Sequence, residues 1–297
     1  MDYVIKTRGL YKKYGAKNAV NDVSINVARG EIYGLIGKNG AGKTSLMKLI
    51  LGLTFPTSGE LELFGGENLS TARKKIGSLI EDPGLYQNRS AKENLTRFAL
   101  LYGEDLSKVD EILETVNLSY TGKKPVKAFS QGMKQRLGIA IALLGDPEVL
   151  ILDEPINGLD PAGIKEIRDT ILRLNREKGT TFIISSHLLD ELAKVVTTYG
   201  IISDGALIEE ISANDIAAQS GKHVRIVTDS EKSALNLIKT AYPDVITEMS
   251  GNEIKLKNHL ADTADINALL VKNGIAVYEI AIAGTDFEQF FINKLGA

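Results

Sequence analysis

Residues Glu31–Thr44 read EIYGLIGKNGAGKT, an apolar run followed by a glycine-rich loop. The run Glu31–Ile36 is typical of a buried strand, and Lys43–Leu51 carries apolar side chains at helical spacing. Between these elements, residues 37–44 match the phosphate-loop pattern G-x-x-x-x-G-K-[ST]. Glycines let backbone N–H groups surround phosphate oxygens, and the following helix directs its positive end at them. The sequence therefore predicts a nucleotide phosphate site.

The loop and the first turn of its helix supply the expected nucleotide contacts. Lys43 should reach the β- and γ-phosphates, and the Thr44 hydroxyl should ligate Mg²⁺. A chance glycine-rich turn is the alternative, and the flanking strand and helix argue against it. The predicted nucleotide-binding residues of this segment are Gly37, Asn39, Gly40, Ala41, Gly42, Lys43, Thr44 and Ser45.

A second apolar run, Val149–Leu152, ends in the two acids Asp153 and Glu154. A buried parallel strand delivers its last residues to the carboxyl edge of the sheet, where α/β proteins bind ligands. We expect Asp153 to complete the Mg²⁺ shell and Glu154 to orient or deprotonate an attacking water. An ordinary acidic turn is the alternative reading.

Strands and helices alternate through the first two thirds of the chain, which predicts an α/β fold with a largely parallel sheet. A helical insert at about 87–145 interrupts this alternation, and two antiparallel strands are expected near the N-terminus. The expected core strands are 31–36, 75–80, 149–152 and 180–185, with a hairpin at 200–210, and the expected core helices are 43–51, 162–178 and 188–196.

The pattern restarts near residue 221 as β-α-β-β-α-β, which favours a small ferredoxin-like α+β domain. We therefore predict a nucleotide-binding domain at 1–220 and an accessory domain at 221–297. The 297 residues carry a net charge of −3 and no cysteine, which excludes disulfide scaffolds and thiol catalysis and argues against a nucleic-acid partner. No run of about 18 apolar residues is present, so we expect no membrane span.

Five further features follow one another in a fixed order. They are Tyr14, Glu81, the segment FSQGMKQR at Phe129–Arg136, the segment Gly158–Asp160 and the segment Ser185–His187. With the phosphate loop and the paired acids, this order resembles the ATP-binding subunit of an ABC transporter over residues 1–211. The resemblance implies the P-loop ATPase fold of that family, with a helical subdomain and an antiparallel β part.

The resemblance also implies roles for individual residues. Tyr14 would stack on adenine, His187 would contact the γ-phosphate, and Asp160 would lie at the contact between two subunits. Ser130 and Gly132 belong to the segment similar to the family's signature loop, which completes the ATP site of a second copy in a head-to-tail homodimer. Lys43, Glu154 and His187 would then be the catalytic residues. Tyr14 as a plain strand aromatic, His187 as a helix cap and Gln135–Arg136 as a solvated helix face are the alternatives.

Two departures from the family pattern narrow the resemblance. The signature reads Phe-Ser-Gln-Gly-Met where the family usually has Leu-Ser-Gly-Gly-Gln, and Glu81 stands where most members carry Gln. The run around Glu81 is similar to that of bacitracin-export and lantibiotic self-immunity ATPases. We hypothesise that Glu81 takes the glutamine's place beside the metal, with Thr44 and Asp153; a surface Glu without a role is the alternative.

The resulting hypothesis is an ATPase subunit, using ATP and Mg²⁺, of an exporter that gives resistance or self-immunity to a peptide antibiotic. It would dock on separate transmembrane permease subunits at the cytoplasmic face of the membrane, with the loop Gln87–Ser90 as the docking surface. The alternatives are a soluble ABC-type switch acting on nucleic acid or ribosomes, an exporter of an unrelated substrate, and a P-loop kinase.

Overall fold

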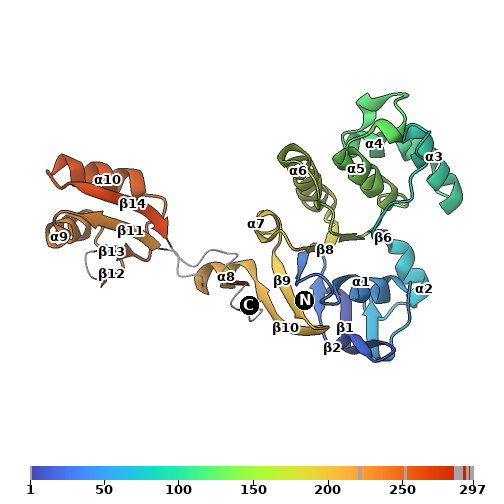
Figure 1. The fold of residues 1–297 in the computed structure, drawn as a ribbon, viewed down its shortest axis with the longest axis horizontal. Coiled ribbons are helices and arrows are strands. Elements are labelled where there is room, and N and C mark those ends of the chain that lie inside the picture. Colours follow the sequence, from blue (N-terminus) through green and yellow to red (C-terminus); the bar gives the residue numbers. More distant parts are fainter. Residues whose placement is uncertain (1, 220–222, 251–252, 284–289, 292–293, 295–297) are drawn as a thin grey trace. The chain divides into compact units, whose positions relative to one another are not determined.

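The computed structural model describes residues 2–219, 223–250, 253–283, 290, 291 and 294, and they form two compact units (Figure 1). One unit comprises Met1–Ala213 together with Lys294–Ala297, and the other comprises Asn214–Asn293. The division falls earlier than the predicted limit at residue 220, because helix α8 (Ala213–Gln219) is grouped with the second unit. No element was expected there from the sequence.

A six-stranded sheet forms the centre of the larger unit, in the order β10-β9-β4-β8-β7-β6. All neighbours are parallel except the hairpin of β9 and β10, which confirms the parallel α/β core. Every residue of β4 and β7 is buried, as expected for strands that are apolar up to the final Asp153 of β7. The strands are β4 (Ile32–Ile36), β6 (Ile76–Leu79), β7 (Val149–Asp153), β8 (Thr181–Ser186), β9 (Thr198–Ser203) and β10 (Ala206–Ser212).

An antiparallel sheet accompanies this core and contains four strands among the described residues. Strand β1 pairs with β2, β3 and β5, and its C-terminal residue is Tyr14. Strand β5 was not predicted from the sequence, because it is mostly exposed and carries only two apolar side chains. The strands are β1 (Tyr3–Tyr14), β2 (Lys17–Val23), β3 (Asn26–Ala28) and β5 (Ser58–Leu63).

Helices α1 (Lys43–Leu51) and α6 (Pro161–Lys178) match their predicted positions closely. The apolar side chains of α1 pack with those of β4 and β7 in the main core. The helix predicted at 188–196 was wrong in extent, since α7 covers only Leu189–Leu192. After Leu192 the backbone forms a turn in which the Val195 N–H bonds to the Leu192 carbonyl, and the Thr197 N–H then bonds to Ile32 in the sheet, which ends the helical course.

The predicted helical insert contains α3 (Ala91–Tyr102), α4 (Val109–Thr115) and α5 (Gln131–Ala142). Figure 1 shows these three helices grouped near β6, and α5 packs on that strand. Ser90 and Glu93 form a capping box at the start of α3. Short turns complete the unit: the four-residue helix α2 (Leu69–Ala72) and the 3₁₀ segments Arg73–Lys75, Leu106–Lys108, Ser119–Thr121 and Val126–Ala128.

The second unit contains an antiparallel sheet in the order β12-β13-β11-β14. Helices α9 (Glu231–Ala241) and α10 (Thr263–Lys272) contact each other and the strands, and the unit's core is formed by Val224, Ile226, Ile254 and their neighbours. Chain order is therefore β-α-β-β-α-β. The strands are β11 (His223–Thr228), β12 (Thr247–Ser250), β13 (Glu253–Leu256) and β14 (Val277–Ala283).

Candidate functional site

The phosphate loop connects the buried end of β4 to the first turn of α1. Gly40 and Gly42 have φ of 81° and 108°, values that favour glycine. A Cβ on Gly37 would meet the Ile202 carbonyl oxygen at 2.3 Å, and one on Gly42 would meet that of Ala19 at the same distance. The loop is thus held close to two neighbouring backbones, and larger residues cannot replace these glycines. Among the other predicted contacts, Asn39 is exposed at the loop, Ala41 is buried beneath it, and Ser45 lies half-buried in the first turn of α1.

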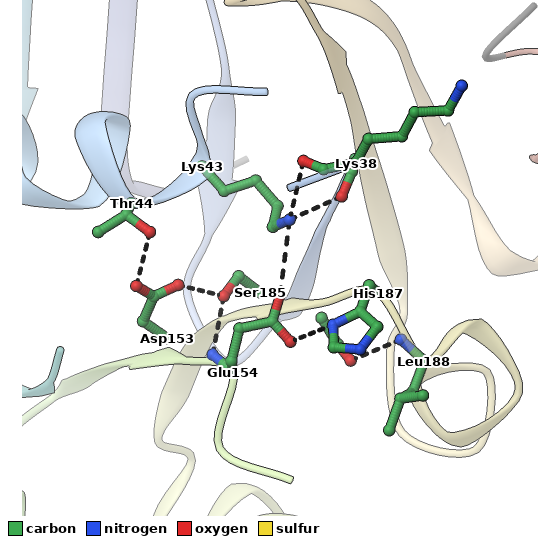
Figure 2. A network of polar contacts seen from close by, with 10 residues as sticks. Lys38, Lys43, Thr44, Asp153, Glu154, Ser185, His187 and Leu188 are labelled. Atoms are coloured by element: carbon green, nitrogen blue, oxygen red, sulfur yellow. Dashed lines mark hydrogen bonds and ion pairs between the residues drawn. The ribbon is translucent and has the colours of Figure 1, made fainter. Parts of the chain in front are cut away.

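Lys43 lies folded across the loop, with a side chain only 6% exposed. Its Nζ donates to the carbonyl oxygen of Gly37 at 2.6 Å and to that of Lys38 at 3.4 Å. The same atom lies 3.5 Å from Oε1 of Glu154 (Figure 2). A phosphate oxygen would be a stronger partner for the ammonium than these carbonyls, because both partners would be charged.

The carboxylate of Asp153 is fixed from two sides. Its Oδ2 accepts a hydrogen bond from the Thr44 hydroxyl at 2.7 Å, and its Oδ1 accepts one from the Ser185 hydroxyl. Ser185 also accepts the backbone N–H of Glu154 at 2.9 Å. The sequence placed Ser185 in a motif without a role. Its position opposite Asp153 in the β7–β8 register makes it the residue that orients both acids.

Glu154 leaves β7 in a left-handed conformation, with φ of 48°. Such a backbone in a non-glycine residue costs about 1–3 kcal/mol and persists only where its surroundings hold it. Its Oε2 lies 2.9 Å from Nδ1 of His187 (Figure 2). Its buried Oε1 forms no hydrogen bond and has the Lys43 ammonium 3.5 Å away. A carboxylate oxygen without a donor, beside a lysine at a phosphate loop, is placed to accept a proton from a water molecule.

Thr44 and Asp153 offer only oxygen ligands, the type that a hard divalent cation such as Mg²⁺ prefers. Within the described ranges, no group of three or more His, Asp and Glu side chains is placed to hold a metal alone. Two protein ligands leave most of the shell to water and to substrate phosphates, which is the usual coordination of Mg²⁺ at nucleotide sites. The residues present therefore fit a magnesium–nucleotide complex.

Glu81 follows β6, the parallel neighbour of β7, and also has a positive φ, 62°. Its Oε1 lies 2.7 Å from Nζ of Lys48 on α1, and this hydrogen bond raises the pKa of Lys48. A cleft of about 320 Å³ is lined by Glu81, Asp153 and Glu154, with Gln87 and other residues. Glu81 thus shares a cleft with the paired acids while its carboxylate is bonded to a lysine.

Tyr14 stands at the end of β1 with its side chain 51% exposed. The ammonium of Lys12 lies 4.8 Å from the centre of its ring and also donates to the Phe55 carbonyl oxygen. This exposure is high for an aromatic residue in a strand. Part of the face of the Tyr14 ring is therefore open to a planar ligand such as adenine.

The signature segment begins α5. Ser130 is its N-cap and accepts from the Met133 N–H at 3.3 Å, while Gly132 faces Gly163 of α6. Asp160 caps α6 in the same way, through the Gly163 N–H at 3.2 Å. These residues gather at the starts of two neighbouring helices, whereas the contacts of Lys43 and Thr44 are to their own loop and to β7.

The alternative reading of Gln135–Arg136 as a solvated helix face is wrong for Arg136, which is 3% exposed. Its guanidinium donates to the carbonyl oxygens of Val116 and Asn117 and pairs with Glu166 at 2.9 Å. Arg136 therefore fastens α5 to the end of α4 and to α6.

Comparison with known proteins places these features in context. The sequence profile of the family described as ABC transporter matches residues 20–157. The bacitracin transport ATP-binding protein BcrA of Bacillus licheniformis is 42% identical over 302 residues, covering 100% of this chain and 98% of the relative. The lantibiotic transport ATP-binding protein SrtF of Streptococcus pyogenes is 44% identical over 207 residues, covering 70% of this chain and 90% of the relative.

Solved structures support the same assignment of the fold. The structure of cbiO1 from Clostridium perfringens, part of an ABC transporter complex, has a TM-score of 0.66 at 26% identity and covers 82% of this chain and 97% of its own. The fold predicted for the ATP-binding part is thereby confirmed. None of the helices in the described part of the chain has the length and apolarity that a membrane crossing requires.

Proposed function

Because this chain belongs to the family of ABC transporter ATP-binding proteins, we propose that it hydrolyses ATP to drive an exporter of a membrane-active peptide antibiotic. One observation carries the ATPase part of this proposal. Thr44, Asp153, Glu154 and His187 come from three separate elements and meet in one bonded network beside Lys43 (Figure 2).

The chemistry of hydrolysis follows from the positions of these side chains. Lys43 would exchange its backbone acceptors for phosphate oxygens, and the carboxylate of Glu154 would hold the attacking water and take its proton. His187 would keep Glu154 oriented and face the γ-phosphate. Mg²⁺, held by Thr44 and Asp153, would neutralise negative charge on the phosphates.

A second copy of the chain is needed to complete the site. Ser130, Gly132 and Asp160 lie at two neighbouring helix starts, whereas Lys43 is bonded to its own loop and to Glu154. The N-terminus of a helix such as α5 favours an anion. We propose that these three residues contact the ATP bound by a partner subunit, so that two ATPs lie between two copies in a symmetric dimer. ATP closes this dimer, and loss of phosphate opens it.

The proposed substrate class rests on two features. Relatives that match this chain are described as bacitracin and lantibiotic transport proteins. Glu81 stands at the cleft edge where the wider family has glutamine, and we propose that it senses the magnesium–nucleotide complex. The second unit, with its β-α-β-β-α-β order, would support dimerisation or regulation. An unrelated exported compound is the remaining candidate for the substrate.

Export requires a membrane partner. We propose that one or more transmembrane permease subunits dock at the cleft that carries Glu81 and Gln87, with this chain at the cytoplasmic face of the membrane. A docked permease would sense any movement of Glu81, since Gln87 lines the same cleft and follows Glu81 after five residues.

The ATPase part is tested by nucleotide binding to a Lys43→Ala variant. Because alanine removes the charged hydrogen bonds from Lys43 to phosphate, ATP binding should weaken by about 10- to 100-fold. Lys38→Ala is the matched control, because Lys38 contributes only its backbone carbonyl to the network and its side chain is exposed. Normal affinity of Lys43→Ala would remove the phosphate loop from the proposal.

The substrate class is tested in cells that contain the chain and its permease. They should survive bacitracin or a lantibiotic better than cells carrying the Glu154→Gln variant. Glu81→Ala should lower both ATPase rate and resistance; if both stay at the wild-type level, Glu81 has no role in coupling. Equal sensitivity of wild type and Glu154→Gln to every peptide tried would leave the ATPase assignment intact and refute the peptide substrate.

A further inference from the structure

Lys48 on α1 is bonded to Glu81, the residue proposed above to sense the magnesium–nucleotide complex. It lies one helical turn after Thr44 on α1, so that the two side chains share a face of the helix. Thr44 bonds to Asp153, whereas Lys48 bonds to Glu81. One face of α1 therefore holds the carboxylates that end two adjacent parallel strands, β7 and β6, the first with a hydroxyl and the second with an ammonium.

The ammonium of Lys48 takes the place that a metal ion could have as the partner of the Glu81 carboxylate. Its Nζ lies 2.7 Å from Oε1 of Glu81 and balances the charge of this carboxylate. Glu81 lines the cleft with Asp153 and Glu154, so its carboxylate can be bonded either to Lys48 or to a metal ion beside Asp153.

The ion pair between Lys48 and Glu81 can be exchanged for another partner. Lys48 is 33% exposed and Glu81 is 66% exposed, and ion pairs this open to water contribute little to stability. The backbone of Glu81 also occupies the left-handed region, from which a non-glycine residue can relax to an extended conformation. Both features allow Glu81 to leave Lys48 when a divalent cation competes for its carboxylate.

From these contacts we propose that Lys48 is a positioning residue that holds Glu81 away from the metal site until magnesium–nucleotide binds. Glu81 then exchanges the ammonium for the metal's ligand shell, and the segment after it moves with it. Lys48 thereby sets how much Mg²⁺ is needed before Glu81 signals an occupied site. This inference rests on the proposed role of Glu81 in sensing the metal.

The test measures the MgCl₂ concentration that gives half-maximal binding of a fluorescent ATP analogue to the full chain. Without its lysine, Glu81 is free to reach the metal, so Lys48→Gln should lower this midpoint by about three-fold. Lys48→Arg should restore a value close to wild type, because it keeps the charge. Lys92→Gln is the matched control: Lys92 forms an exposed ion pair of similar length with Asp110 in the helical insert, and its removal should change nothing.

The double variant separates a positioning role from a direct one. In a Glu81→Gln background, Lys48→Gln should produce no further shift, since no carboxylate remains to be released. An equal shift in both backgrounds would mean that Lys48 acts on the nucleotide itself, and no shift in either would mean that it does not act; both results overturn the inference. If wild-type protein binds the analogue without any dependence on Mg²⁺, the proposed metal-sensing role of Glu81 fails, and the inference about Lys48 fails with it.

Discussion

Nδ1 of His187 lies 2.9 Å from Oε2 of Glu154, although 33 residues separate them in the sequence. The contact exists because β7 and β8 are parallel neighbours and both side chains follow the carboxyl ends of these strands. An ionised carboxylate can only accept, so Nδ1 carries the proton of this hydrogen bond. The pairing fixes the orientation of the imidazole ring and directs Nε2 away from Glu154.

The His187→Ala variant should lose ATP hydrolysis but still bind the nucleotide. Removing a group that orients a general base lowers the rate by about 10²-fold or more, whereas the phosphate loop is unchanged. Phosphate release and binding of a fluorescent ATP analogue, measured on the same preparation, separate the two effects. His259→Ala, in the second unit, is the control and should hydrolyse normally. Full activity of His187→Ala would exclude the residue from the site.

Glu154→Gln should bind ATP and almost stop turning over. The amide keeps the size of the side chain but cannot take a proton, and the carboxylate that now faces Lys43 at 3.5 Å is neutralised. ATP affinity should therefore rise slightly while the rate falls by about 10²- to 10³-fold. Light scattering with Mg²⁺ and ATP should find a stable dimer of this variant.

The control for this experiment is Glu111→Gln, an exposed acid of α4. It should turn over at the wild-type rate and show no ATP-dependent dimer that outlasts hydrolysis. A monomeric profile for Glu154→Gln with saturating ATP would contradict the arrangement in which two copies share two nucleotides.

The sequence predicted the phosphate loop and the paired acids, because each is determined by residues that are close together in the chain. The loop around Gly37–Thr44 and the acids Asp153 and Glu154 follow from spacing and from the apolar run Val149–Leu152. The network that joins them depends on strand order, which spacing does not specify. Ser185 illustrates this, because its bond to Asp153 requires β8 to lie beside β7.

Three features of the structure were not predicted from the sequence, each for its own physical reason. Lys48 was not singled out in the sequence, since its partner Glu81 is brought near by the pairing of β6 with β7. Strand β5 was not predicted because an exposed edge strand needs few apolar residues. Arg136 was left open as a surface residue, because a basic side chain two residues from Lys134 gives no sign that it is buried under two helices.

Arg136→Met should destabilise the larger unit. The substitution keeps volume but leaves the carbonyl oxygens of Val116 and Asn117 without their donor and Glu166 without its partner. A loss of about 2–3 kcal/mol follows from these groups, which corresponds to roughly 4–12 °C in a unit of this size. Calorimetry of the full chain measures it. Arg89→Ala, which removes an exposed pair with Glu93, should change the transition by about 1 °C or less.

The stability of the second unit should depend on pH through His259. Its Nδ1 lies 2.7 Å from Asp262 and its Nε2 lies 3.1 Å from Asp244, while the ring packs on Tyr242 at 4.9 Å. The hydrogen bond to Asp262 is the main cause of its raised pKa, with Asp244 adding to it. Only the protonated ring can donate to both carboxylates at once.

A pKa that is raised in the folded state means that the stabilisation is complete below the unfolded value of about 6.5 and is lost as pH rises through the folded value. The midpoint of thermal unfolding of the second unit should therefore exceed that of a His259→Gln variant at pH 5.5, and the two should converge as the pH is raised above neutrality. Asp229→Asn, which changes an acid of the same unit away from this cluster, should leave the pH dependence intact. A constant difference between wild type and His259→Gln across this range would mean that the histidine acts through packing and not through its charge.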